Sequence, residues 1–278
     1  MSGTEEAPPG VDVSVPSAAR LYDYYLGGQL NYAADRAAGA EVNEKVPEIR
    51  DVAWSNRGFL QRAVRWVSEQ GVNQFIDIGA GLPTQNNTHQ VARAARPDAR
   101  VVYVDHDPIV QIHANALLEG DDQTTVLLRD MRDAEAVLDD PATRALIDFS
   151  KPVAVLLVAV THFLPDDEDP WGLVARYVSR LVPGSYLVLS AGTQDFQPDW
   201  RVEAVREVYS RTPTGVHTRT RAQFERYLEG LEIVPPYEGA KAEVTYVGFW
   251  GAEDTEEADS DGSRWSYCAV ARVPGEES

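Results

Sequence analysis

Three acidic residues stand at or near the ends of successive apolar runs in the chain. Asp77 lies inside the first run, Asp105 ends the second and Asp130 follows the third. If these runs form parallel strands, their carboxyl ends meet at the edge of the sheet where ligands bind. Asp105 also follows Gly81 at close to the roughly 20 residues that separate a nucleotide-binding turn from the acid that holds a ribose. The pattern predicts a nucleoside-binding site.

The segment Gly79-Ala80-Gly81 predicts a sharp turn directly beneath the ligand, because glycine lets the backbone turn tightly and approach a ligand closely. The dinucleotide pattern G-x-G-x-x-G would need a third glycine at position 84, where Thr84 stands. A carboxylate at Asp77 would repel a diphosphate and attract an ammonium group. These residues favour an adenosine joined to an amino acid, which is S-adenosylmethionine, over NAD.

Further cofactor contacts are expected beside the same acids. His106 follows Asp105 in one turn, Asp130 could accept a hydrogen bond from an adenine amino group, and Met131 could pack on the adenine ring. Each feature has a structural alternative: the two glycines could form only a turn, Asp105 could cap the next helix, and Asp130 could be a turn residue. An acid or a turn at each successive strand end, in the required order, favours the binding site.

The fourth apolar run ends in Val160-Thr161-His162. Val160 and Thr161 are expected against the cofactor. His162 is placed where it could take a proton from a methyl acceptor, and its near-neutral reference pKa suits a general base. The alternative is that the imidazole makes only a local hydrogen bond or packs near the methionine part of the ligand. We predict no metal site.

The tyrosine-rich segment before the first strand is predicted to form a lid that contacts the substrate. Aromatic faces attract cations such as a sulfonium, and we predict that Tyr24, Gly28 and Asn31 take part. Arg57 could bind a carboxylate. The alternatives are that the tyrosines pack in a core and that Arg57 pairs with a surface acid.

The elements that must position these residues follow an alternating order of strand and helix, which predicts a parallel sheet with helices on both faces. Residues 1–16 are expected to be a disordered acidic tail and 17–71 helical, with order beginning near Ser17. Residues 72–274 are expected to form the ligand-binding domain, as one compact unit with 17–71. We predict single helices over 85–96, 134–146 and 171–181, strands over 231–234, 244–250 and 265–273, and disorder in the acidic loop 252–262.

The composition narrows the possible partners. A net charge of −19 opposes nucleic acid and anionic membrane surfaces as partners. The first residues lack the basic and apolar regions of a signal peptide, and the longest apolar run, 153–160, is too short to span a bilayer. A cytoplasmic location is therefore expected. The single cysteine, Cys268, lies in an apolar run typical of a buried thiol.

These motifs together resemble a known class of proteins. The stretch 74–190 is similar to the Rossmann-like S-adenosylmethionine-dependent methyltransferases, on the segments 75–81, 104–105, 128–130, 161–165 and 181–184. More narrowly, the segments 20–28 and 81–89, with Asn31, Tyr32 and Asp35, resemble a bacterial methyltransferase family of unassigned substrate. Thr84 agrees with this narrower family.

The resemblance implies a seven-stranded sheet of order 3-2-1-4-5-7-6 with strand seven antiparallel, and direct methyl transfer from S-adenosylmethionine to an oxygen or nitrogen of a small molecule. The segment Val160-Thr161-His162 stands where related enzymes that methylate amino groups of adenine or glutamine carry Asn/Asp-Pro-Pro-Tyr/Phe. Two alternatives stay open at this point: a module that binds S-adenosylmethionine or S-adenosylhomocysteine without turnover, and, less favoured, an NAD-dependent oxidoreductase.

Overall fold

The computed structural model describes residues 8, 11–83 and 86–275 of the 278-residue chain. Thr84, on which the argument about the missing third glycine depends, lies outside the described residues. Among the described residues, no helix is long and apolar enough to cross a membrane.

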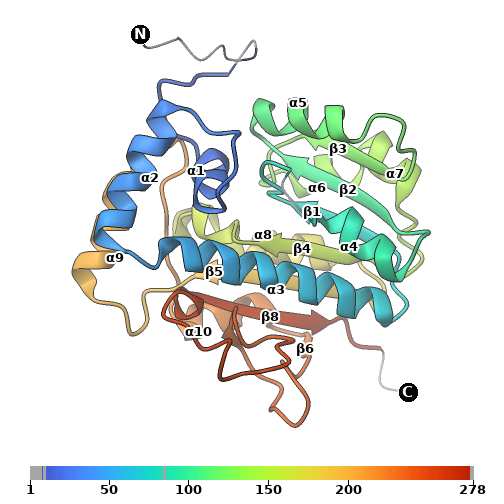
Figure 1. Ribbon diagram of the computed structural model, residues 1–278. Helices are drawn as coiled ribbons and strands as arrows, with labels where there is room; N and C mark the ends of the chain where they lie inside the picture. Colours follow the sequence, from blue (N-terminus) through green and yellow to red (C-terminus); the bar gives the residue numbers. More distant parts are fainter. Residues whose placement is uncertain (1–7, 9–10, 84–85, 276–278) are drawn as a thin grey trace.

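One mixed sheet forms the centre of the molecule, in the order β3-β2-β1-β4-β5-β8-β6, with β7 also paired to β8 (Figure 1). Strands β1 to β5 pair in parallel, and β8 runs antiparallel to β5, β6 and β7. The strands are β1 Gln74–Ile78, β2 Arg100–Asp105, β3 Thr124–Leu128, β4 Ala154–Val158, β5 Tyr186–Gly192, β6 Glu232–Ile233, β7 Thr245–Tyr246 and β8 Ser266–Arg272. The expected order and the antiparallel strand are confirmed. The short β7 lies within the strand predicted over 244–250 and makes the sheet eight-stranded, one strand more than the resemblance implies.

The helices alternate with the strands as predicted. They are α1 Ala18–Tyr25, α2 Ala33–Lys45, α3 Ile49–Glu69, α4 Thr88–Ala95, α5 Pro108–Leu117, α6 Ala134–Leu138, α7 Pro141–Leu146, α8 Pro170–Val178, α9 Asp199–Tyr209 and α10 Arg221–Glu225. Short 3-10 turns follow β4 at Thr161–Phe163 and Asp166–Glu168, extend α10 at Arg226–Leu228 and precede β8 at Ser263–Trp265.

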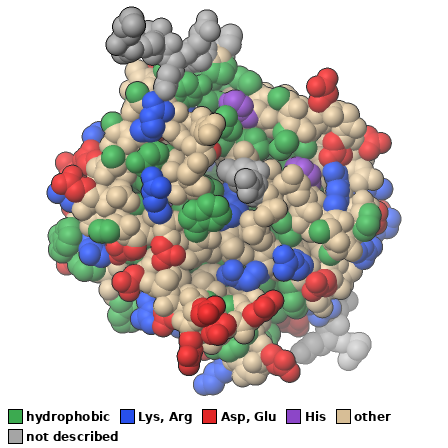
Figure 2. All heavy atoms as spheres, viewed as in Figure 1, with side chains coloured by type: hydrophobic (Ala, Val, Ile, Leu, Met, Phe, Trp, Pro, Cys, Tyr) green, Lys and Arg blue, Asp and Glu red, His purple; other side chains and the backbone are tan. Residues whose placement is uncertain are grey.

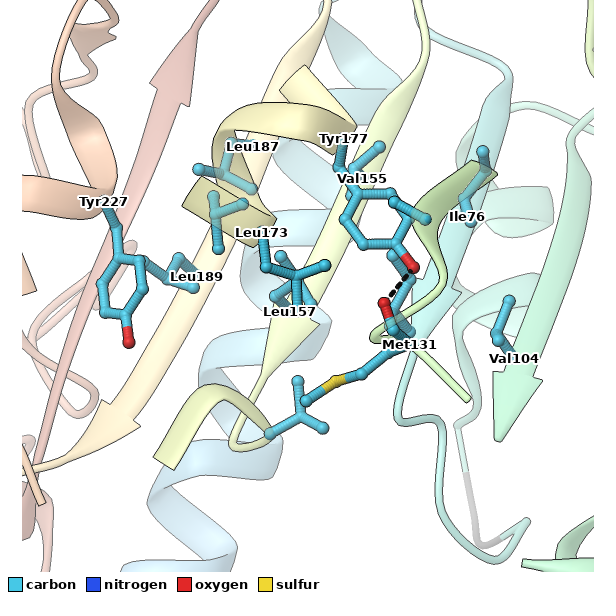
Figure 3. Packing of buried hydrophobic residues seen from close by; sticks show 14 of the residues in the cluster. Ile76, Val104, Met131, Val155, Leu157, Leu173, Tyr177, Leu187, Leu189 and Tyr227 are labelled. Carbon is cyan, nitrogen blue, oxygen red and sulfur yellow. Dashed lines mark hydrogen bonds between the residues drawn. The ribbon is translucent and has the colours of Figure 1, made fainter. Parts of the chain in front are cut away.

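Alternate residues of the central strands pack against opposite helical layers, as the two-residue period of a strand requires. On β4, Ala154 and Leu156 contribute to the core beneath α3 and α4. Val155 and Leu157 point to the other face, against Leu173 and Tyr177 of α8 (Figure 3). Both faces of the parallel strands are therefore buried, which leaves their carboxyl ends as the open edge.

Two predictions about local structure are wrong. The expected helix over 134–146 is broken into α6 and α7, because Pro141 cannot continue a helix and Asp140 instead accepts a hydrogen bond from Ala142 N and begins a new one. The acidic loop 252–262 follows a defined path, because Arg264 holds Asp259 through two contacts of 2.7 Å and Gly262 N donates to Asp51 of α3.

The N-terminal helices pack as a layer of their own beside α3 and α9 (Figure 1). Ser17 caps α1 as predicted, accepting a hydrogen bond from Arg20 N. The buried Arg20 pairs with Asp35 of α2 at 2.9 Å and donates to the carbonyls of Asp12 and Val15. Residues before Ser17 therefore already make hydrogen bonds with α1. Residues 1–7 and 9–10 of the predicted tail lie outside the described residues.

Candidate functional site

A cavity of about 210 Å³ lies along the carboxyl ends of the parallel strands. Its lining comes from the turns after β1, β2, β3 and β4, the end of β5, and helices α1, α3 and α9. Of the predicted cofactor residues, nine line it: Asp77, Gly79, Ala80, Gly81, Asp105, His106, Asp130, Met131 and Val160. The strand ends therefore converge on one space, as the sequence predicts.

The turn after β1 requires glycine at two positions for different reasons. Gly79 has φ +70°, and a Cβ built there would lie 2.2 Å from Cγ2 of Val160, in the turn after β4. Gly81 has φ +66°, but a Cβ there would meet no atom within 4 Å. Glycine is therefore required at position 79 by both the steric contact with Val160 and the backbone conformation. At position 81 it is required by the backbone conformation alone.

Asp105 ties the turn after β2 to the glycine turn. Its Oδ2 accepts a hydrogen bond from Gly81 N at 2.9 Å, and its Oδ1 accepts one from Asp107 N, also at 2.9 Å. Burial raises the pKa of this carboxyl, while the two backbone donors act in the opposite direction. Asp107, not Asp105, caps α5 by accepting from Ile109 N, so the structural alternative for Asp105 is not the one that the molecule adopts.

A pair of buried opposite charges lies beside the glycine turn. The carboxyl of Asp77 is 5 % exposed and accepts a hydrogen bond from Thr88 Oγ1 at 2.6 Å. Burial raises its pKa to about 6, and the Arg57 guanidinium opposes that shift. Arg57 is 7 % exposed, lies over the ring of Tyr22, and its Nε is buried without a hydrogen-bond partner. The guanidinium therefore offers a buried donor to a ligand.

The turn after β3 contributes a buried methionine and an exposed carboxylate. Met131 is buried, and its carbonyl accepts a hydrogen bond from Tyr177 OH at 2.8 Å (Figure 3). Asp130 is exposed and pairs with Arg132, which also contacts Glu168. Both predicted residues line the cavity; Asp130 would have to share its carboxylate between Arg132 and a ligand.

The turn after β4 also adopts a left-handed conformation, but without glycine. Ala159 has φ +55°, and its N donates to both the carbonyl and the Oγ of Ser190, at 3.0 and 2.9 Å. Val160 lines the cavity as predicted. The structure does not bring Thr161 to the cavity: the side chain is 1 % exposed and turned into the protein, because the chain enters a 3-10 turn at this residue.

His162 lines the cavity, and one of its two ring nitrogens already accepts a hydrogen bond from the protein. Gly192 N donates to His162 Nδ1 at 3.1 Å, so the neutral ring carries its proton on Nε2. Burial and the nearby Arg219 lower the pKa of His162 to about 3. Such an imidazole is a hydrogen-bond donor at neutral pH. This geometry argues against the predicted role as proton acceptor.

The comparisons with known proteins agree with this geometry. A family model described as S-adenosyl methyltransferase matches residues 4–274. The chain belongs to this family. Its members depend on S-adenosylmethionine and transfer methyl groups, which rules out the NAD-dependent alternative. No curated protein is similar enough to match this methyltransferase.

Two solved structures are similar to this methyltransferase over nearly the whole chain. A methyltransferase candidate from Thermobifida fusca is 37 % identical, with a TM-score of 0.89, over 98 % of this chain and 100 % of that one. A DUF574 family protein from Streptomyces avermitilis is also 37 % identical, with a TM-score of 0.87, over 95 % and 99 %. An O-methyltransferase family protein from Burkholderia thailandensis, 13 % identical with a TM-score of 0.50 over 84 % and 63 %, shares the fold alone.

The N-terminal segment of this methyltransferase contributes different residues from those predicted. Tyr24 packs on Gly39 of α2 and beneath the guanidinium of Arg50, and it does not line the cavity. Gly28 and Asn31 belong to a closed turn in which Asn31 Nδ2 donates to Asp23 and to the Gly28 carbonyl. The structure therefore places these three residues outside the lining of the cavity, because a helix presents only one face to the cavity and that face carries Tyr22 and Tyr25.

Several cavity residues gave no signal in the sequence. Asn56 of α3 accepts a hydrogen bond from Ser190 Oγ at 2.6 Å and donates from Nδ2 to Tyr22 OH at 3.0 Å; Tyr22 OH in turn donates to the Ala53 carbonyl. This chain of hydrogen bonds, which we call the Asn56 relay, joins the turn after β4 to α1. Its members are far apart in sequence, so only the largely apolar face of α3, on which Asn56 is one of three buried polar residues with Arg57 and Ser68, could have indicated it. Other missed lining residues are Phe163, Val202, Val205, Tyr209 and Trp265.

Proposed function

We propose that this methyltransferase transfers a methyl group from S-adenosylmethionine to an oxygen or nitrogen atom of a small molecule. The observation that carries the proposal is the buried pair Asp77 and Arg57 beside the glycine turn. Opposite charges at this place match the ammonium and carboxylate of an amino-acid tail. The unpartnered Nε of Arg57 supports this match, because a buried donor without a partner is costly unless a ligand satisfies it.

The remaining residues fit the adenosine part of the same ligand. The carboxylate of Asp105 stands at the position expected for binding the ribose hydroxyls, while its two backbone donors fix its direction. Gly79 and Gly81 leave space for close approach to the backbone, and Met131 and His106 line the next part of the cavity. We therefore expect Asp77 and Arg57 to hold the methionine end, and Asp105, Met131 and Asp130 the nucleoside end.

When bound, S-adenosylmethionine supplies an electrophilic methyl group: an acceptor lone pair forms the new bond to carbon, the sulfur keeps the electron pair of the broken bond, and the proton that the acceptor loses is released to solvent. The protein's contribution is alignment and exclusion of water. His162 contributes a hydrogen bond from Nε2 that fixes the acceptor's direction. We expect no proton transfer to His162, because its free ring nitrogen already carries a proton.

The surface and the cavity support a small acceptor. On the face that carries α3, acidic side chains gather toward the bottom of the view, over the C-terminal elements (Figure 2), and the whole chain carries a net charge of −19. A polyanion such as nucleic acid would be repelled. Much of the cavity is lined by buried side chains such as Leu60 and Tyr25, which suits a molecule that enters almost completely.

Calorimetry with S-adenosylhomocysteine tests the cofactor site. Asp105→Ala removes charge-assisted hydrogen bonds of roughly 1.5–3 kcal/mol each, so we expect an affinity at least about tenfold weaker. Glu119→Ala, at an exposed site outside the cavity, should leave the affinity unchanged. Equal affinities of Asp105→Ala and the unchanged protein would remove Asp105 from the site.

Methyl transfer is tested with S-adenosylmethionine labelled in the methyl group and a cell extract separated by size. We expect label in the small-molecule fraction and none in protein or nucleic acid. Label only in a macromolecular fraction would contradict the small-molecule acceptor. Tight binding of S-adenosylhomocysteine with no transfer to any fraction would favour the binding module without turnover.

A further inference from the structure

The lining of the cavity changes from charged to uncharged side chains along the sheet. Its charged side chains come from β1, the turns after β2 and β3, and one position of α3, which is Arg57. The other part is formed by α1, the turn after β4, the end of β5, α9 and the residues around Trp265. Among the described residues this part, which we call the apolar half, contributes no Asp, Glu, Lys or Arg to the lining. The charged groups of the cofactor therefore belong to one half, and the acceptor to the other.

Aromatic side chains form much of the apolar half. The rings of Phe163 and Tyr209 are stacked, with centroids 6.1 Å apart and an interplanar angle of 24°. Tyr22 and Tyr25 enter from α1, and Trp265 from the segment before β8. Aromatic side chains from several elements favour an aromatic ligand, because rings pack best on other rings or planar groups.

The apolar half also contains uncharged polar groups. Thr214 Oγ1 is buried without a hydrogen-bond partner, and the buried hydroxyl of Tyr25 has the hydroxyl of Tyr209 as its polar neighbour. His162 adds a donor at Nε2. All three groups are neutral at pH 7, since burial and the neighbouring Tyr209 raise the pKa of Tyr25 and burial lowers that of His162. They suit an uncharged hydroxyl and leave an ion without a counter-charge.

We propose that the methyl acceptor is an uncharged, planar aromatic compound with a hydroxyl group, bound in the apolar half. This inference rests on the proposed function and names its substrate class. A charged acceptor would lose its hydration in a space that supplies no opposite charge, and such a loss is costly. An aliphatic acceptor would make none of the ring contacts that this aromatic lining offers.

The test uses the full chain saturated with S-adenosylhomocysteine, and two probes of similar size. Titration calorimetry should show 2-naphthol binding at least about tenfold more tightly than 2-naphthoate at pH 7.5, because the carboxylate must be desolvated. Equal or tighter binding of 2-naphthoate overturns the proposal. So does the absence of 2-naphthol binding up to its solubility limit. Failure of S-adenosylhomocysteine to bind in the first place would instead contradict the proposed function.

Variants of α9 locate the binding. Val205→Glu places a charge in the apolar half, and we expect 2-naphthol to bind at least about tenfold more weakly while S-adenosylhomocysteine binds as before. Trp200→Glu adds the same charge to the exposed side of the helix, where Trp200 is 59 % exposed, and should change neither affinity. Val205→Trp fills the space without a charge and should also prevent 2-naphthol binding. Unchanged 2-naphthol binding in both Val205 variants overturns the proposal.

The hydroxyl of Tyr25 gives a finer test. Tyr25→Phe removes this hydroxyl and should weaken 2-naphthol binding about fivefold, with no change for naphthalene, which has no hydroxyl. Equal losses for the two probes would show that the loss does not come from a hydrogen bond to the ligand's hydroxyl, and would contradict the recognition of a hydroxyl.

Discussion

The turns that follow β1 and β4 are neighbours that reach the same left-handed conformation by different means. After β1 the conformation belongs to Gly79 and Gly81, with φ +70° and +66°. After β4 it belongs to Ala159, with φ +55°. The two turns touch, since a Cβ at Gly79 would lie 2.2 Å from Val160. One turn is allowed by residue type, whereas the other is imposed by its surroundings.

The surroundings that impose the second turn are polar and buried. Ala159 N donates to Ser190 Oγ, and the Asn56 relay continues from Ser190 through Asn56 to Tyr22. Ser190 is fully buried and Asn56 is 4 % exposed. A left-handed alanine costs roughly 1–2 kcal/mol, which a satisfied buried network can offset. The turn after β4 is therefore coupled to the N-terminal helices through buried hydrogen bonds, whereas the turn after β1 meets that segment through apolar packing, in which Leu82 lies in one cluster with Ala19 and Tyr32.

The largest effect is expected where the two turns meet. Gly79→Ala adds a Cβ at positive φ and against Val160, so both strain and overpacking act. We expect a loss of about 4 kcal/mol in the free energy of unfolding, measured by denaturant titration. The affinity for S-adenosylhomocysteine should fall at least about tenfold.

A second substitution distinguishes the two causes. Val160→Ala removes Cγ1 and Cγ2, including the atom 2.2 Å from the new Cβ, and leaves the Val160 Cβ position at 2.8 Å. The double variant should therefore lose at least about 1 kcal/mol less than the sum of the single losses. If the losses in the free energy of unfolding were additive, steric overlap between the two turns would not contribute to them.

Breaking the Asn56 relay should have the next largest effect. Asn56→Ala leaves Ser190 Oγ without its acceptor and removes a donor from Tyr22 OH. We expect a loss of about 3 kcal/mol in the free energy of unfolding, since buried polar groups left unsatisfied cost about 1–3 kcal/mol each. Ser55→Ala, on the same helix with one hydrogen bond of 3.3 Å to Asp51, should cost less than about 0.5 kcal/mol. Equal losses for the two variants would contradict the role of the relay.

Asp77, on the strand that leads into the glycine turn, should show a pH-dependent effect. Burial raises its pKa to about 6 in the folded protein, above the ordinary value of an aspartate, which is about 4. Protonation therefore favours the folded state, and this stability is lost as pH rises from about 4 to above 6. Asp77→Asn should therefore be more stable than the unchanged protein by about 2–3 kcal/mol at pH 7.5. The difference should shrink toward zero near pH 4.

Ligand binding should show the opposite sign at Asp77, because the ionised carboxylate attracts an ammonium group. The affinity of the unchanged protein for S-adenosylhomocysteine should rise with pH through about 6, and that of Asp77→Asn should be lower and flat over the same range. Asp98→Asn is the control: the hydrogen bond from Asn73 lowers the pKa of that exposed carboxyl, so it should give no stabilisation at pH 7.5. Parallel stability curves for Asp77→Asn and the unchanged protein would contradict the raised pKa.

The contrast between the two turns also explains what the sequence could predict. The first turn was predictable because glycine spacing and strand-end acids are local patterns, and Asp77, Gly79, Gly81 and Asp105 all line the cavity. Most helices and the sheet order follow from local periodicity and from the resemblance to a known class. The residues of the second turn depend on contacts between β4, β5, α3 and α1, which no local pattern records.

The placement of predicted residues outside the cavity lining has the same physical origin. Tyr24 and Tyr25 are adjacent, yet only Tyr25 reaches the cavity, because the packing of α2 on α1 decides which face of α1 is turned inward. The direction of His162 is likewise set by a hydrogen bond from Gly192, 30 residues away.

The smallest effects come from changing the residue type of each turn without changing its contacts. Gly81→Ala adds a Cβ that meets nothing within 4 Å, so only the left-handed strain remains, about 1 kcal/mol of lost stability. Ala159→Gly removes the same strain but makes the unfolded chain more flexible, and its net effect should lie within about 1 kcal/mol of zero. Denaturant titration of both variants gives the comparison. If Ala159→Gly cost as much as Asn56→Ala, the methyl group of Ala159 would itself hold the turn, and the buried relay would not be what imposes its conformation.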